Sequence, residues 1–140
     1  MISKQQKPVD SGFGAKSEPT EVMAGIDLSG KTAVVTGGYS GIGTETSRAL
    51  VDAGCDVYIP ARRTDVAAKE LEGIVPAKNI VEMDLANPRS VQSFVDDFSG
   101  QTSKLDILIN NAGVMACPEI RTQEGWELQF AVNQIGHFVL

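Results

Sequence analysis

Apolar and polar positions along the chain repeat with two periods, one typical of strands and the other of amphipathic helices. Continuous apolar runs predict four strands, at residues 31–36, 56–59, 79–83 and 106–109. Apolar residues three or four positions apart predict four helices, at residues 42–53, at 64–72, from Pro88 to a stop at Gly100, and from about Thr122 onward. Strands that alternate with helices favour a parallel sheet with right-handed crossovers, which is a doubly wound α/β fold.

The two ends of the chain differ from this pattern. Residues 1–24 are rich in Ser, Gly, Lys, Pro and Glu without periodicity, so we expect a flexible or loosely docked arm before a domain at 25–140. The last predicted helix is apolar nearly all round and has no stop signal, and the fourth strand would leave an apolar sheet edge uncovered. Both features predict the front part of a longer protein, rather than a short natural protein or an obligate oligomer.

Composition narrows the function classes. A net charge of −6 argues against nucleic acid as the main partner, so an anionic cofactor would need a local positive group. No apolar run approaches the roughly 18 residues of a membrane span, and the polar start lacks the apolar core of a signal peptide. The two cysteines, Cys55 and Cys117, show no metal-ligand spacing. We therefore expect no metal site, two reduced thiols and a cytoplasmic protein.

The segment TGGYSGIG, Thr36 to Gly43, lies between the first predicted strand and the first long helix. Glycines let the backbone turn tightly, and the start of a helix offers free N–H groups and a partial positive charge. Together they form a cradle for a phosphate. We expect this turn to bind a cofactor through Gly37, Tyr39, Ser40, Gly41, Ile42 and Gly43.

The end of the second strand carries Arg62, 19 residues beyond Gly43. Proteins that bind NAD usually have an acidic residue near this place, because it accepts hydrogen bonds from the ribose hydroxyls. A guanidinium can instead bind a 2′-phosphate, which an acid would repel. The sequence therefore favours NADP over NAD. The alternative is that Arg62 and Arg63 only keep a loop soluble.

Two more polar motifs follow the third and fourth strands. The carboxylate of Asp84 could accept a hydrogen bond from an adenine amino group while Leu85 lies against the ring, although an Asp can also simply form a turn. The segment NNAG at 110–113 can bridge neighbouring strand ends through an asparagine amide, or be a mere turn. Because ligands of such sheets bind at the carboxyl ends of the strands, we expect a shared site. Its residues here are Asp84, Leu85, Asn111, Ala112 and Gly113.

On these motifs the chain resembles the short-chain dehydrogenase/reductase family. The segments 36–43, 84–85 and 110–113 are similar to its TGxxxGIG, Asp-Leu and NNAG motifs, and 132–138 is similar to the helix that bears its catalytic asparagine, here Asn133. The likeness covers about residues 26–140 and is closest to the retinol-dehydrogenase-like, NADP-preferring group. It implies a Rossmann-type doubly wound parallel sheet, incomplete here with strands 1–4.

The resemblance also implies an activity. It is hydride transfer between the nicotinamide of NADP and a carbonyl or alcohol of a small molecule, by a homo-oligomer when full length. In this family an asparagine holds a proton-relaying water, while a serine and a Tyr-x-x-x-Lys pair act on the substrate. Only Asn133 has a counterpart here, since Tyr39 lies in the turn and Tyr58 in a strand. We expect this chain to be the cofactor-binding half, inactive alone.

Two rival interpretations stay open at this point. One is a non-catalytic NADP-binding sensor or interaction protein. The other is a methyltransferase on a similar sheet, which would normally carry an acid where this chain has Ala61-Arg62. His137 follows Asn133 by four residues on the same helix face, and a packed or partly exposed histidine is favoured there over a group near the nicotinamide.

Overall fold

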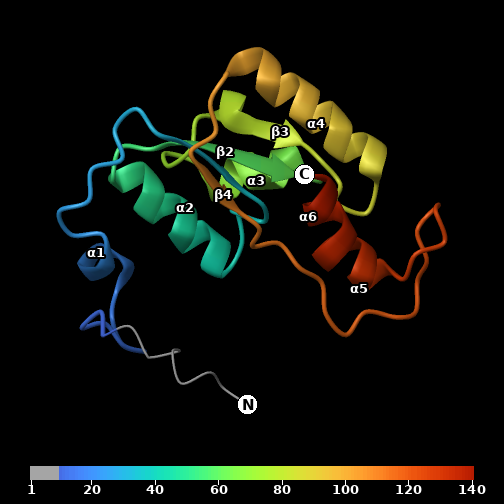
Figure 1. Cartoon of the computed structure of the whole chain (residues 1–140), viewed down its shortest axis with the longest axis horizontal. Coiled ribbons are helices and arrows are strands. Elements are labelled where there is room, and N and C mark those ends of the chain that lie inside the picture. The colour runs from blue at the N-terminus through green and yellow to red at the C-terminus, as the bar shows by residue number, and fades with distance from the viewer. Residues whose placement is uncertain (1–9) are drawn as a thin grey trace, which may run out of the picture.

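The computed structural model describes residues 10–140, and its centre is a four-stranded sheet in the order β3-β2-β1-β4 (Figure 1). The strands are β1 (Thr32–Val35), β2 (Asp56–Ala61), β3 (Ile80–Glu82) and β4 (Ile107–Ile109). Ala33 of β1 pairs with Val57 on one side and Ile107 on the other. All pairings are parallel, so the carboxyl ends of the strands lie along one edge of the sheet. The predicted fold class is confirmed.

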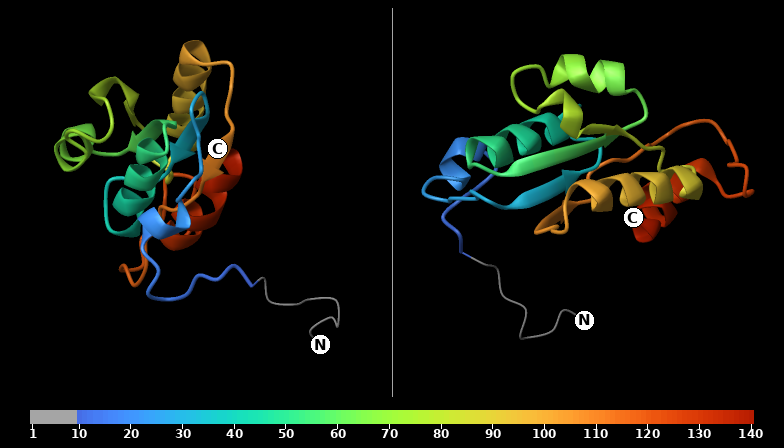
Figure 2. Two further views of the ribbon diagram at one scale, coloured as in Figure 1. Left: turned by 90° about the vertical axis from the view of Figure 1, so that its left-hand side faces the viewer. Right: turned by 90° about the horizontal axis from the view of Figure 1, so that it is seen from above.

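Helices cover both faces of this sheet. They are α1 (Pro19–Val22), α2 (Ile42–Asp52), α3 (Thr64–Glu70), α4 (Pro88–Gln101), α5 (Leu128–Phe130) and α6 (Gly136–Val139), with a 3-10 turn η1 (Ala77–Asn79) and a π-helical turn η2 (Ala131–Ile135) between α5 and α6. Figure 2 shows α2 and α3 on one side of the sheet, and α4 with the α5–α6 segment on the other. The strand order reverses between β1 and β4, which is where such sheets bind ligands.

Each face of the sheet has its own apolar core. On the α2 side, Leu50, Ile59 and Leu71 belong to one buried cluster. On the α4 side, Phe94 and Val132 belong to another. β1 is buried along its whole length and contributes to both clusters, which explains why its sequence is a continuous apolar run.

Four predicted helix boundaries differ from the structure. α2 ends at Asp52 and α3 at Glu70, one and two residues before their predicted ends. Gly100 does not end α4, which runs on to Gln101, and the backbone of Gly100 is not left-handed as a terminating glycine would be. The last helix begins at Leu128 rather than near Thr122, because the preceding residues form a turn in which the Thr122 N–H donates to the Trp126 carbonyl at 2.8 Å. Glu127 then caps the helix by accepting from the N–H groups of Gln129 and Phe130, and these bonds lower the pKa of its carboxyl.

Two other expectations were a flexible or loosely docked arm at residues 1–24 and an uncovered apolar edge of the sheet. In the arm predicted at 1–24, residues 1–9 lie outside the described residues, and Pro19–Val22 form α1 beside α2. β4 is an edge strand among residues 10–140, with Leu108 41 % exposed. Within the same residues, no helix combines the length and the apolar character needed to cross a membrane.

Candidate functional site at the strand ends

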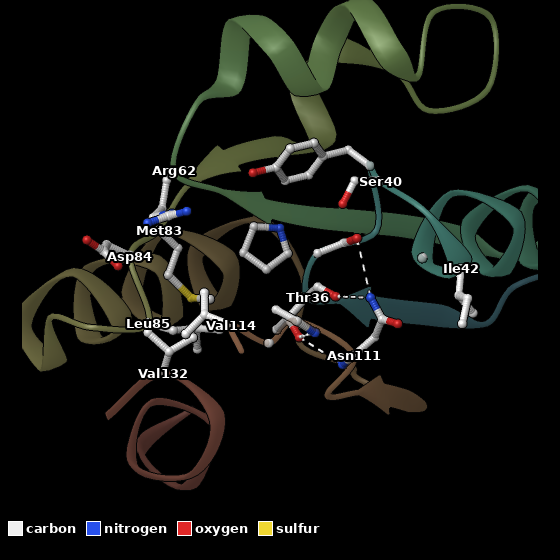
Figure 3. Close-up of a pocket in the computed structure, with 16 residues that line it drawn as sticks. Thr36, Ser40, Ile42, Arg62, Met83, Asp84, Leu85, Asn111, Val114 and Val132 are labelled. Atoms are coloured by element: carbon white, nitrogen blue, oxygen red, sulfur yellow. Dashed lines mark hydrogen bonds between the residues drawn. The ribbon is translucent and has the colours of Figure 1, made fainter. Parts of the chain in front are cut away.

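A cavity of about 340 Å³ opens where the four strands end (Figure 3). It is lined from all four strand ends and from η2, by Thr36, Gly37, Tyr39, Ser40, Ile42, Gly43, Pro60, Arg62, Met83, Asp84, Leu85, Asn111, Ala112, Gly113, Val114 and Val132. Of the residues predicted to bind a cofactor, only Gly41 is not in this lining. The structure therefore brings the predicted residues together at one edge of the sheet.

The glycine-rich turn is packed so tightly that a side chain at Gly37 or Gly43 would press against neighbouring atoms. Gly37 has a φ of 63°, and a Cβ on it would lie 3.0 Å from the Cα of Ala112. A Cβ on Gly43 would collide with the carbonyl oxygen of Gly37. Gly41 supports the turn from outside the cavity, as the residue before α2 with a φ of 55°. The turn thus packs directly against the loop that follows β4.

Asn111 ties that loop to the end of β1, as the sequence predicted for an asparagine amide. Its Nδ2 donates to the carbonyl oxygens of Thr36, at 2.9 Å, and Gly37, at 3.3 Å (Figure 3). In return, the Thr36 hydroxyl accepts from the backbone N–H groups of Asn111 and Ala112, both at 3.0 Å. These bonds fix the spacing between two walls of the cavity.

Arg62 and Asp84 are the charged residues of the lining. Figure 3 draws the Arg62 guanidinium next to Met83 and Asp84, and all three residues line the cavity. One oxygen of Asp84 accepts from the Ala86 N–H at 2.9 Å, so the turn-forming role weighed for this aspartate is present in the structure. Arg63 begins α3 and does not line the cavity.

The floor of the cavity near Asp84 is apolar. It is formed by Met83, Leu85, Val114 and Val132, which all pack into the core on the α4 side of the sheet. The sequence analysis named Leu85 alone among them. Met83, Val114 and Val132, like Pro60 on the neighbouring strand, were missed because an apolar cavity wall and an apolar core have the same sequence pattern.

Asn133 lies outside the cavity lining, on η2. Its side chain is engaged with the backbone of Val114: Oδ1 accepts from the N–H at 2.8 Å and Nδ2 donates to the carbonyl at 2.9 Å. The side chain therefore holds the loop after β4 in place. The catalytic role that the resemblance gives to Asn133 stays a prediction.

His137 has a partner that the sequence did not reveal. Its Nε2 lies 2.8 Å from the Thr36 hydroxyl and its Nδ1 lies 3.2 Å from the Asn133 carbonyl. Tyr58, by contrast, lies in β2 as predicted, and its side chain is in the core. It is 6 % exposed, its ring meets Phe98 edge-on at a centroid distance of 5.0 Å, and burial raises the pKa of its hydroxyl.

No group of three or more metal-ligating side chains gathers anywhere in residues 10–140. The cavity instead combines one guanidinium, the first residues of α2, small residues that allow close backbone approach, and an apolar floor. Such a set can hold an anionic group at the glycine turn and a flat apolar ring beside Leu85. This matches a nucleotide better than it matches a metal ion.

Comparisons with known proteins agree with this geometry. The family model for short chain dehydrogenases matches residues 31–140. The chain is 44 % identical over 135 residues to the short-chain dehydrogenase TIC 32 B, chloroplastic, of Brassica napus, covering 93 % of this chain and 42 % of that protein. It is 40 % identical over 120 residues to mouse (Mus musculus) retinol dehydrogenase 11, covering 82 % and 38 %. The chain thus spans about two fifths of the length of these relatives.

Solved structures show the same fold. The Pseudomonas aeruginosa RhlG/NADP active-site complex matches with a TM-score of 0.67 and 29 % identity, over 81 % of this chain and 46 % of that one. The 3-ketoacyl-(acyl-carrier-protein) reductase from Brucella melitensis, complexed with NADH, matches with a TM-score of 0.66 and 28 % identity, over 81 % and 48 %. From its motifs, its fold and these matches, the chain belongs to the short-chain dehydrogenase/reductase family, and it corresponds to the N-terminal part of the proteins in that family.

Proposed function

We propose that this chain is the cofactor-binding half of an NADP-dependent oxidoreductase that transfers hydride between nicotinamide and a carbonyl or alcohol carbon of a small molecule. The observation that carries this proposal is the position of Arg62. It lines the same cavity as the glycine turn, at the end of the strand next to β1. The chain has a net charge of −6, yet this cavity offers a guanidinium to an anion.

Each wall of the cavity has a part in binding. The turn from Gly37 to Gly43 and the start of α2 receive the phosphates that join the two halves of the cofactor. Leu85 and the apolar floor receive the adenine ring. One oxygen of Asp84 accepts from the Ala86 N–H, and the other accepts from the adenine amino group. Arg62 binds the 2′-phosphate through paired, charge-assisted hydrogen bonds.

The chemistry itself belongs to the cofactor, which supplies or accepts the hydride when bound. This chain's own residues bind and orient. Asn111 and Asn133 hold the loop after β4 rigid, so that Gly113 and Val114 form a fixed wall of the cavity. A fixed wall lowers the barrier because the reacting groups are already aligned.

The test is a pair of matched substitutions, Arg62→Ala and Arg63→Ala. Each removes one guanidinium from the same loop, but only Arg62 lines the cavity. We expect Arg62→Ala to weaken NADPH binding about 10- to 100-fold, since hydrogen bonds to charged groups contribute about 1.5–3 kcal/mol. NADH lacks the 2′-phosphate, so its affinity should stay within about twofold of the starting value.

A fluorescence titration with each nucleotide measures both effects. Equal losses for NADPH and NADH, or equal effects of the two arginine substitutions, would show that the arginines only keep the loop soluble. In that case the NADP assignment is wrong, and a site for NAD becomes the better proposal.

Three further proposals follow from the same reading. Neither Tyr39 nor Tyr58 is followed four residues later by a lysine, so we propose that the 140-residue chain binds cofactor but does not turn over substrate.

We also propose a homo-oligomer for the full-length protein. Free Cys55 and Cys117 favour the cytoplasm, and a fluorescent fusion would distinguish it from the chloroplast named for the Brassica relative.

A further inference from the structure

The Thr36 hydroxyl, at the end of β1, has more polar neighbours than the three hydrogen bonds that a hydroxyl can form. Thr36 is 0 % exposed, so water does not compete for this group. Its Oγ1 lies 3.0 Å from the backbone nitrogens of both Asn111 and Ala112, 2.8 Å from Nε2 of His137 and 3.5 Å from the carbonyl oxygen of Ile109. Four neighbours for one hydroxyl require a definite assignment of protons.

That assignment follows from counting. A hydroxyl has one proton to donate and two lone pairs that accept. The two backbone N–H groups can only donate, so toward Thr36 they occupy both lone pairs. The Asn111 N–H also donates to the Ile109 carbonyl at 3.0 Å, and that carbonyl accepts from the Thr36 N–H at 3.0 Å as well. The single proton of Thr36 must then go to an acceptor, and Nε2 of His137 at 2.8 Å is much better placed than the Ile109 carbonyl at 3.5 Å.

The histidine is fixed by the same argument. If Nε2 accepts a hydrogen bond, the neutral ring must carry its proton on Nδ1. The nearest partner of Nδ1 is the carbonyl oxygen of Asn133 at 3.2 Å, which can accept that proton. Every donor in this chain of bonds then meets an acceptor, from the Asn133 carbonyl through His137 and Thr36 to the loop after β4.

We propose that His137 is a positioning residue: in its Nδ1–H tautomer it orients the Thr36 hydroxyl so that both lone pairs hold the N–H groups of Asn111 and Ala112. His137 does not line the cavity itself and acts through Thr36. Thr36 and His137 are 101 residues apart, so this bond joins the last helix to the first strand. The inference rests on the proposed function only where it concerns NADPH affinity.

The first test needs no variant and no cofactor. The chain contains a single histidine, so ¹⁵N correlation spectra of its imidazole report on His137 alone. In the spectrum of the neutral ring we expect the pattern of one protonated nitrogen at Nδ1 and one unprotonated nitrogen at Nε2. A pattern of the Nε2–H tautomer, or an average of both tautomers, would overturn the proposal.

The second test separates hydrogen bonding from packing. His137→Leu fills similar space without an acceptor, whereas His137→Gln provides a side-chain oxygen that can accept from Thr36. Amide hydrogen exchange at Ala112 should rise about five- to tenfold in the leucine variant, as expected for one lost hydrogen bond. The rise at Asn111 should be smaller, because its N–H also donates to the Ile109 carbonyl at 3.0 Å. Exchange at both amides should return most of the way in the glutamine variant. Phe138→Leu, at the neighbouring 85 % exposed position, is the control and should change neither amide.

The outcomes distinguish this inference from the proposed function. Equal exchange in the leucine and glutamine variants would show that His137 only packs, and the inference would fail. If the tautomer and the exchange behave as expected but the unsubstituted chain does not bind NADPH, the inference holds and the cofactor assignment fails. If NADPH does bind, its affinity should fall more in His137→Leu than in His137→Gln.

Discussion

Gly43, the second residue of α2, provides a sharp test of how the cavity is built. A Cβ at this position would collide with the carbonyl oxygen of Gly37 and come within 2.7 Å of Nδ2 of Asn111. Neither atom can move freely, because the two are themselves hydrogen-bonded at 3.3 Å. The substitution Gly43→Ala must therefore open the glycine turn or push Asn111 away from β1. Overpacking of this kind costs about 1–3 kcal/mol of unfolding free energy.

Gly100, in the last turn of α4, is the matched control. Nothing lies within 4 Å of a Cβ built on it, and its backbone is helical. Gly100→Ala adds the same methyl group to an open surface and should stabilise the helix by about 0.5–1 kcal/mol, because alanine has the higher helix propensity. The same glycine-to-alanine substitution is thus expected to lower the unfolding free energy at Gly43 and to raise it at Gly100.

Urea unfolding followed by circular dichroism measures the change in stability of both variants. We expect the midpoint to fall for Gly43→Ala and to rise for Gly100→Ala, with little change in the slope. NADPH titration of the same samples should show weaker binding only for Gly43→Ala. If Gly43→Ala is as stable as the parent chain, the turn and the loop after β4 are not packed as described, and the argument for a rigid cavity fails.

Two further predictions concern the sheet and its cores. Phe94→Ala, at a 1 % exposed position on the buried face of α4, should lower the unfolding free energy by about 3–5 kcal/mol in urea unfolding. Phe138→Ala, at an 85 % exposed position, should change it by no more than about 0.5 kcal/mol. Asp106 accepts from the Thr32 N–H and pairs with Lys31 and Lys104, which lowers the pKa of its carboxyl to about 2. Its unfolded pKa is about 3.9, so its stabilising effect should be complete above that pH and vanish as the pH falls through about 2. In Asp106→Asn, acid unfolding curves measured across this range should lose that part of their pH dependence, and an unchanged curve would contradict the assignment.

The sheet could be predicted from sequence because each strand is bounded by strong local signals. The apolar run before the glycine turn and the Asn87-Pro88 helix start mark their elements without help from the rest of the chain. In the structure, Asn87 accepts from the Arg89 N–H at 3.0 Å, as a residue at a helix start should. Elements with such signals were placed to within a few residues.

The errors occurred where the same local signal serves two structures. Gly100 resembles a helix stop, yet it lies inside the last turn of α4 at a position where no left-handed backbone is needed. Trp126 has helical spacing with later apolar residues, but its carbonyl closes a turn with Thr122 before the helix begins. In both cases the local pattern is compatible with two structures, a helix end or helix interior at Gly100 and a helix or turn at Trp126, and the tertiary structure decides between them.

The cavity was only partly predictable for a related reason. Polar residues at strand ends stand out in a sequence, so Arg62 and Asn111 could be assigned to one site before their distances were known. The apolar floor could not, because Val114 and Val132 look like ordinary core residues. The bond between Thr36 and His137 was also beyond reach, since it joins residues 101 positions apart.

Of these missed residues, Val132 and His137 belong to the helical segment from α5 to α6, and Val114 and Thr36 are hydrogen-bonded to it. Gly136 lies so close to the backbone of Leu85 that a Cβ on it would collide with the Leu85 carbonyl oxygen, which places the segment against the end of β3. Asn133 holds Val114 after β4, and His137 holds Thr36 at the end of β1. One helical segment therefore contacts three of the four strand ends that surround the cavity. Displacing it would move the cavity walls at Leu85 and at Thr36 together, so this segment, and not the sheet alone, sets the distance between them.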